Sequence, residues 1–170
     1  MLRLIAISGI FTAAAIGSIP QSQAAEPTKA TYLITGLHCP PCTRTVQSSL
    51  SRVQGIKSAK VDWNSKNATI EFDESVVPAQ EVAKLIADTP HMMGGGSHYA
   101  GWLALKTPDV KDEASGKKVT DAAGKVAGVK RAVAYPQQHS VGIEFSPDGS
   151  LTSQQLIEAL GKDGIKAENY

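Results

Sequence analysis

The heptapeptide VQGIKSA at residues 53–59 returns as VAGVKRA at residues 126–132, an offset of 73 positions. At the same offset, the tripeptide IEF at 70–72 falls on a second IEF at 143–145. Chance similarity between amphipathic segments is not expected to keep one offset through a helix end, a turn and a strand. The chain therefore contains two copies of one structural unit.

Each copy has the hydrophobic pattern of a strand, a helix, two strands, a helix and a final strand. The first copy is expected to hold strands over 30–35, 57–63 and 68–72 and helices over 43–53 and from Pro78 onward, with residues 91–98 in the place of its fourth strand. The second is expected to hold strands over 102–106, 130–135, 140–145 and 165–167 and helices over 113–126 and 151–161. This order predicts an α+β fold of two tandem ferredoxin-like βαββαβ sandwiches, each with two helices on one face of an antiparallel sheet.

Both cysteines of the chain lie in the first copy, within the stretch GLHCPPC at residues 36–42. Cys39 falls on the loop after the first strand. Cys42 falls in the first turn of the next helix, where the helix dipole favours a thiolate. At the offset of 73 these positions hold Asp112 and Ser115, so the second copy has the same frame without thiols. We interpret the pair as a functional feature rather than a requirement of folding.

Two thiolates at this spacing can approach a soft ion from two sides. Cu(I) and Hg(II) accept two sulfur ligands, whereas zinc usually takes four ligands. Pro41 removes one donor N–H and stiffens the loop between the cysteines, which favours a partly preorganised pair.

A CxxC loop between a strand and a helix of such a unit resembles the heavy-metal-associated domain family, and most nearly its periplasmic mercury- and copper-binding proteins. The resemblance covers about residues 30–90 and extends to the second copy only as a degenerate frame. It implies that Cys39 and Cys42 bind Cu(I) or another soft heavy-metal ion. It also implies a metal transporter or another metal-binding protein as partner. Leu37 stands where the family has Met, and His38 replaces its usual hydroxyl residue.

A second group of candidate ligands lies after the second helix of the first copy. In the family fold this turn lies beside the cysteine loop, and thioether and imidazole groups suit Cu(I). The additional candidates are His38, His91, Met92, Met93 and His98. The alternatives are edge packing for the methionines, a solvated loop position for His38, and a plain interdomain linker for the glycine run.

The start of the chain has the pattern of a secretory signal peptide: Arg3, an apolar run over 4–19 and small residues before position 25. The alternative is a retained membrane anchor, but the run is short for a span of roughly 20 apolar residues. The predicted organisation is a signal peptide over 1–25, a heavy-metal-associated domain over 26–92, a Gly-rich linker over 93–99 and a second ferredoxin-like repeat without metal cysteines over 100–170. This predicts an exported, periplasmic protein with no membrane span after cleavage.

The 17 basic and 16 acidic residues become equal in number once Arg3 is removed with the leader. This balance argues against nucleic acid or an anionic membrane as the main partner. No arrangement of nucleophile, base and acid indicates an enzyme. The leading interpretation is an exported protein that captures and passes on Cu(I), with Hg(II) as the second candidate. Two alternatives remain: a thiol–disulfide protein that uses the CPPC pair, and a structural disulfide in an interaction module.

Overall fold

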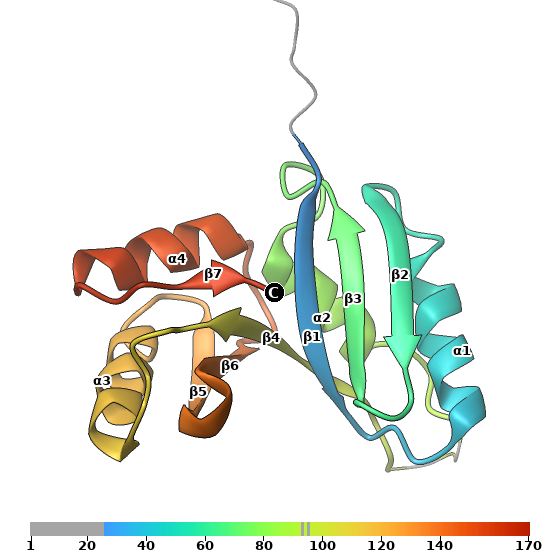
Figure 1. Ribbon diagram of the computed structural model, residues 1–170. Coiled ribbons are helices and arrows are strands. Elements are labelled where there is room, and N and C mark those ends of the chain that lie inside the picture. The colour runs from blue at the N-terminus through green and yellow to red at the C-terminus, as the bar shows by residue number, and fades with distance from the viewer. Residues whose placement is uncertain (1–25, 93, 95) are drawn as a thin grey trace, which may run out of the picture.

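The computed structural model describes residues 26–92, 94 and 96–170. The leader proposed for residues 1–25 and the candidate ligand Met93 lie outside these ranges. The elements in chain order are β1 (Thr28–Thr35), α1 (Pro40–Leu50), β2 (Ile56–Asp62), β3 (Asn67–Phe72), α2 (Ala79–Ala87), β4 (Ala100–Lys106), α3 (Glu113–Ala123), β5 (Val129–Tyr135), the 3-10 turn η1 (Pro136–Gln138), β6 (Ser140–Phe145), α4 (Ser153–Lys162) and β7 (Glu168–Asn169) (Figure 1). Within the described ranges, no helix is long and apolar enough to cross a membrane.

The strands form one antiparallel sheet in the order β2-β3-β1-β4-β6-β5, with β7 paired to β4. In the ferredoxin-like unit the fourth strand lies beside the first. The first unit has the order β2-β3-β1-β4 and the second has β5-β6-β4-β7, so each has this arrangement. The predicted α+β fold of tandem ferredoxin-like units is confirmed.

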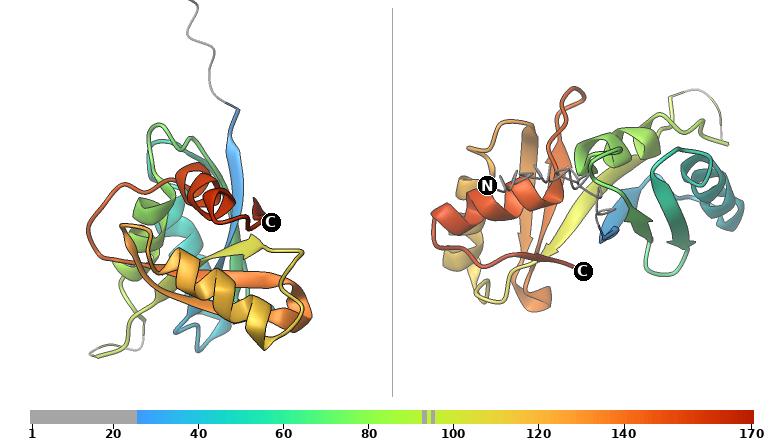
Figure 2. Two further views of the ribbon diagram at one scale, coloured as in Figure 1. Left: turned by 90° about the vertical axis from the view of Figure 1, so that its left-hand side faces the viewer. Right: turned by 90° about the horizontal axis from the view of Figure 1, so that it is seen from above.

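Strand β4 belongs to both units. On one edge its residues 100–104 pair with β1, and on the other its residues 102–106 pair with β6. It was expected to be only the first strand of the second copy. Residues 91–98 were expected to stand in for the fourth strand of the first copy, but those that the structure describes form turns and irregular chain. Figure 2 shows β4 crossing from one half of the molecule to the other.

The register places one core under the whole sheet. Tyr32 of β1 pairs with Leu103 of β4, and Leu103 pairs with Ile143 of β6. All three side chains are fully buried in a single hydrophobic cluster. A side-chain carbon on Gly101, two positions before Leu103, would meet Ile86 of α2. The side chains on this face therefore point toward the helices, with α1 and α2 at one end of the sheet and α3 and α4 at the other (Figure 1).

Two side chains of the first unit also bind the second unit. The amide of Gln80, which is only 1% exposed, donates to the carbonyl oxygens of Ser146 and Asp148 at 2.9 and 3.0 Å and accepts from the Leu151 N–H at 3.0 Å. Glu74 accepts a hydrogen bond from the Ser153 N–H at the start of α4, at 2.7 Å. The two units therefore share polar contacts as well as a strand and a core.

Three elements have ends that differ from the prediction by three residues, whereas the other ends lie within two residues of it. Helix α1 begins at Pro40 rather than at position 43, because proline at the first helical positions already has a helical φ and has no N–H to leave unpaired. Helix α3 ends at Ala123 rather than at 126. The last strand is Glu168–Asn169 rather than 165–167, because Ile165 still closes the end of α4 by donating from its N–H to the Leu160 carbonyl.

Candidate functional site

Three loops meet at the same end of the first unit: the β1–α1 loop with the cysteines, the β2–β3 turn, and the segment between α2 and β4. They lie at the lower end of Figure 1. Hydrogen bonds join them. Lys66 in the β2–β3 turn donates to the Leu37 carbonyl at 3.3 Å, and His91 after α2 binds the Gly36 carbonyl. The antiparallel pairing of β1 with β3 and β4 is what brings the three together.

Gly36 sets the path of the cysteine loop. Its φ is +86°, a region that only glycine enters without strain. A side-chain carbon at this position would also lie 2.3 Å from the carbonyl oxygen of His98. The next residue, Leu37, is buried under the loop. The loop is therefore fixed by a close backbone contact and one apolar anchor.

The two cysteines lie at the start of α1. Cys39 is the N-cap residue, with an extended backbone, and Cys42 is the third helical residue. Their Cα atoms are 5.4 Å apart, and their sulfurs are joined in a disulfide. The Cys42 side chain is fully buried, whereas Cys39 is partly exposed. Two sulfurs this close can converge on a single ion when they are reduced to thiolates, and the oxidised pair must be reduced first.

The helix start offers few donors to a thiolate. Pro40 and Pro41 have no amide hydrogen, and the Cys42 N–H donates to the Cys39 carbonyl at 3.0 Å. The first turn of α1 also has no acidic residue. The partial positive charge at the helix N-terminus remains, but part of the hydrogen-bond donation that usually accompanies it is lost.

A positive charge reaches the loop from the β2–β3 turn. Besides its bond to the Leu37 carbonyl, the Lys66 ammonium lies over the Trp63 ring, 2.7 Å from the ring centroid. Desolvation lowers the pKa of Lys66 from its ordinary value. The backbone of Lys66 is left-handed, with a φ of 54°. Sequence analysis did not identify this residue, because a lysine in a polar turn gives no indication of where its ammonium points.

The histidines predicted as further ligands are partly brought together. His91 Nε2 lies 2.9 Å from the Gly36 oxygen, and because a carbonyl only accepts, this nitrogen donates. The His91 ring is 5.7 Å from the exposed His38 ring and 4.6 Å from the ring of Tyr99, whose pKa is raised by burial. His91 could use Nε2 for a metal only after releasing the Gly36 carbonyl.

The remaining candidates are less closely tied to the cysteines. Met92 is 57% exposed, and the His98 side chain is exposed while its carbonyl packs on Gly36. Across 26–92, 94 and 96–170, no group of three or more His, Cys, Asp or Glu side chains is arranged to hold a metal ion. The described site is therefore a cysteine pair with histidines nearby, and not a closed three- or four-ligand cage.

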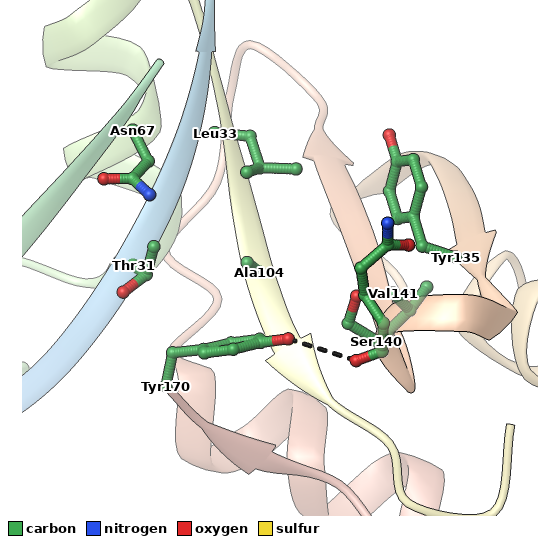
Figure 3. Close-up of a pocket in the computed structure, with 9 residues that line it drawn as sticks. Thr31, Leu33, Asn67, Ala104, Tyr135, Ser140, Val141 and Tyr170 are labelled. Carbon is green, nitrogen blue, oxygen red and sulfur yellow. Dashed lines mark hydrogen bonds between the residues drawn. The ribbon is translucent and has the colours of Figure 1, made fainter. Parts of the chain in front are cut away.

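A well-formed cavity lies elsewhere, on the helix-free face of the sheet (Figure 3). Its volume is about 420 Å³, and its lining includes Thr31, Leu33, Ala104, Tyr135 and Tyr170. None of the residues that line this cavity is a cysteine, methionine, histidine or acid. Its chemistry does not suit a soft metal ion, so the cysteine loop remains the candidate site.

Comparison with known proteins finds a family model that matches part of this chain. Residues 31–91 match the heavy-metal-associated domain. The copper chaperone CopZ of Enterococcus hirae is 29% identical over 58 residues, which are 34% of this chain and 84% of that protein. The periplasmic component of the mercuric transport protein of Shigella flexneri is 31% identical over 58 residues, which are 34% of this chain and 64% of that protein.

A longer match includes both units. The copper-transporting ATPase HMA5 of rice is 26% identical over 142 residues, which are 81% of this chain but only 14% of the ATPase. Among solved structures, the water-soluble region of the P-type ATPase CopA from Bacillus subtilis aligns over 85% of this chain and 91% of its own. Its identity is 18% and its TM-score 0.40.

Proposed function

We propose that the protein is an exported carrier of a soft metal ion, which it holds between the Cys39 and Cys42 thiolates and passes on without catalysing a reaction. The observation that carries the proposal is the placement of the two sulfurs within bonding reach of each other at a loop end, inside a segment that matches the heavy-metal-associated domain. The thiol-free helix start of the second unit supports it, since that unit folds without the pair.

Unequal burial of the two sulfurs suits transfer by ligand exchange. Cys42 is fully buried and Cys39 is partly exposed, so a partner's thiol would approach the ion from the Cys39 side. An ion with only two protein ligands can accept a third before releasing its first. The partner in this proposal is a metal transporter or another metal-binding protein.

We propose Cu(I) as the favoured cargo and Hg(II) as the second candidate, because both accept two sulfur ligands. Relatives named for copper and for mercury each match 58 residues of this chain. Export to the periplasm rests on the leader-like pattern of residues 1–25. His38, His91, Met92, Met93 and His98 remain proposed additional ligands, with His38 and His91 favoured by their position beside the loop.

The test is a Cu(I) titration of the protein from residue 26 onward, reduced and kept anaerobic, against a chelator of known affinity. We expect binding of one ion that is lost in Cys39→Ser/Cys42→Ser. Single variants His38→Ala and Met92→Leu then test the third ligand. Failure of the reduced wild type to compete with the chelator would exclude the metal-carrier function.

A second candidate function is thiol–disulfide exchange, and the disulfide between Cys39 and Cys42 favours it. In that reaction a substrate dithiol would give two electrons and two protons to the pair, leaving a substrate disulfide and two thiols on the protein. The reduction potential of the pair, measured against glutathione, tests this candidate. A potential below about −300 mV is typical of inert structural disulfides and would exclude it.

A further inference from the structure

We propose that Lys66 is a specificity-determining residue, which makes the cysteine pair favour Cu(I) over Hg(II) through the charge of the bound complex. The inference rests on the proposed metal-carrier function and adds to it the reason for a preference between the two ions. It depends on where the Lys66 ammonium lies and on the net charge of each complex.

The first step is the position of the ammonium. Lys66 Nζ donates to the carbonyl of Leu37, two residues before Cys39, and the Trp63 ring beneath it holds the side chain against the loop. Lys66 also anchors β1, since its own carbonyl accepts from the Ile34 N–H at 2.8 Å. Two contacts of the ammonium and one backbone hydrogen bond of the same residue therefore hold the charge beside the cysteine loop.

The second step is that few hydrogen-bond donors lie near the cysteines to stabilise a negative charge there. The two prolines and the internal bond of the Cys42 N–H leave the first turn of α1 with few donors for a negative site. Because these donors are few, a neighbouring ammonium contributes a larger share of the electrostatic stabilisation of a negatively charged metal complex. A coulombic interaction near a protein surface remains substantial over several ångström.

The third step is the charge balance of the two complexes. Cu⁺ and two thiols give Cu(SR)₂ with one negative charge and release two protons. Hg²⁺ and two thiols give Hg(SR)₂ with no net charge and release the same two protons. An adjacent positive charge stabilises the first complex and has no net charge to act on in the second.

The ratio of the two affinities isolates this effect. Loss of Lys66 also changes the ease with which the free thiols ionise, but both metals bind the same apoprotein. That contribution cancels in the ratio of Cu(I) to Hg(II) affinity, and so does any general loosening of the loop that affects both metals equally. Only the difference in charge between the two complexes remains.

The experiment uses reduced protein from residue 26 onward and the variants Lys66→Gln, Lys66→Arg and Lys57→Gln. Lys57→Gln removes an exposed lysine at the opposite end of β2 and is the matched control. Cu(I) affinity is measured against a Cu(I) chelator, and Hg(II) affinity against a small dithiol. Thermal unfolding of each reduced apoprotein shows whether it is folded.

We expect Lys66→Gln to lower the ratio of Cu(I) to Hg(II) affinity about tenfold, as one screened unit charge would. Lys66→Arg and Lys57→Gln should leave the ratio within about threefold of wild type, and added salt should shrink the Lys66→Gln effect. An unchanged ratio in a folded Lys66→Gln variant, with tight wild-type binding, would overturn the inference alone. Absence of wild-type binding to either metal would overturn the proposed function itself.

Discussion

At the scale of single residues, Gly36 controls the cysteine loop most directly. Gly36→Ala would combine a strained left-handed backbone with a side-chain carbon 2.3 Å from the His98 oxygen. We expect the free energy of unfolding to fall by roughly 1–3 kcal/mol. We also expect His91 to lose its bond to the Gly36 carbonyl. Urea denaturation and the NMR signals of the His91 ring measure these two changes.

Gly94 provides the control for this prediction. Its φ is +78°, close to that of Gly36, but no described atom lies within 4 Å of a side-chain carbon built there. Gly94→Ala therefore tests the backbone conformation without the clash and should cost only about 1 kcal/mol. Equal losses in the two variants would show that the contact with His98 is unimportant.

Residue types predicted part of the site. Both cysteines were singled out from the motif, and the resemblance to the heavy-metal-associated family implied that the segment after α2 lies beside their loop. His91 of that segment does bind the loop. The position of the Lys66 ammonium could not be predicted, because it depends on a left-handed turn and a Trp63 contact that no spacing rule encodes. The burial of Gln80 could not be predicted either, since the sequence shows only a polar residue at a helix start, whereas the side chain is buried and bonded to the second unit.

At the scale of elements, helices α1 and α3 begin in the same way with different chemistry. Cys39 and Asp112 are both N-cap residues, with φ values of −148° and −147°, and Cys42 and Ser115 are both third in the helix. Asp112 and Ser115 form a capping box, whereas Cys39 makes no side-chain cap. Residues separated by 73 positions in the sequence therefore occupy equivalent places at the starts of these two helices.

This equivalence predicts the effect of giving α1 the cap of α3. Cys39→Asp/Cys42→Ser should make the protein more stable than its reduced wild type by about 0.5–2 kcal/mol, because a carboxylate at position 39 would add an acceptor for the N–H of residue 42 and a negative charge at the helix N-terminus. Urea denaturation in a reducing buffer measures the gain. Cys39→Ala/Cys42→Ala is the uncapped control, and a capped variant no more stable than this control would contradict the prediction.

The capping box of α3 should also have a pH signature. Hydrogen bonds from the Ser115 hydroxyl and N–H lower the pKa of Asp112. Its stabilising effect is therefore complete above the unfolded pKa, which is near 3.8, and is lost as the pH falls through the lower folded value. We expect wild type to exceed Asp112→Asn in thermal stability at pH 7, with the difference closing under acid conditions. A difference that stays constant down to pH 2 would rule out the ionised cap.

The sequence predicted the type of each helix and strand better than it predicted which strands pair. Among the residues that the structure describes, hydrophobic periodicity located all four α-helices and six of the seven strands, because each buries one face. It could not show that β4 has partners on both edges, since a strand covered on one face has the same pattern at the edge and at the centre of a sheet. The pairing of β4 with strands of both units depends on which strand edges are open for hydrogen bonding, and the hydrophobic pattern does not record this.

At the scale of the whole molecule, Gln80 connects the two units. Gln80→Ala would leave the Ser146 and Asp148 carbonyls and the Leu151 N–H without their present partner in a buried setting. We expect a loss of roughly 2–4 kcal/mol, since each unsatisfied buried group costs about 1–3 kcal/mol. Glu81→Ala, one residue further along α2 and partly exposed, is the matched control and should change stability little. Equal denaturation midpoints for the two variants would contradict the prediction.

The shared strand predicts where the chain can be divided. A fragment of residues 26–92 contains the cysteine loop but ends before β4, so residues 31–35 of β1 lose their pairing partners and Tyr32 loses Leu103. A fragment of residues 26–110 keeps that strand. We expect the shorter fragment to show no cooperative thermal transition and the longer one to show one, with circular dichroism and amide NMR dispersion as the measurements. Cooperative unfolding of fragment 26–92 at the temperature of fragment 26–110 would mean that the first unit is complete without β4. The proposed metal site would then be independent of the second unit.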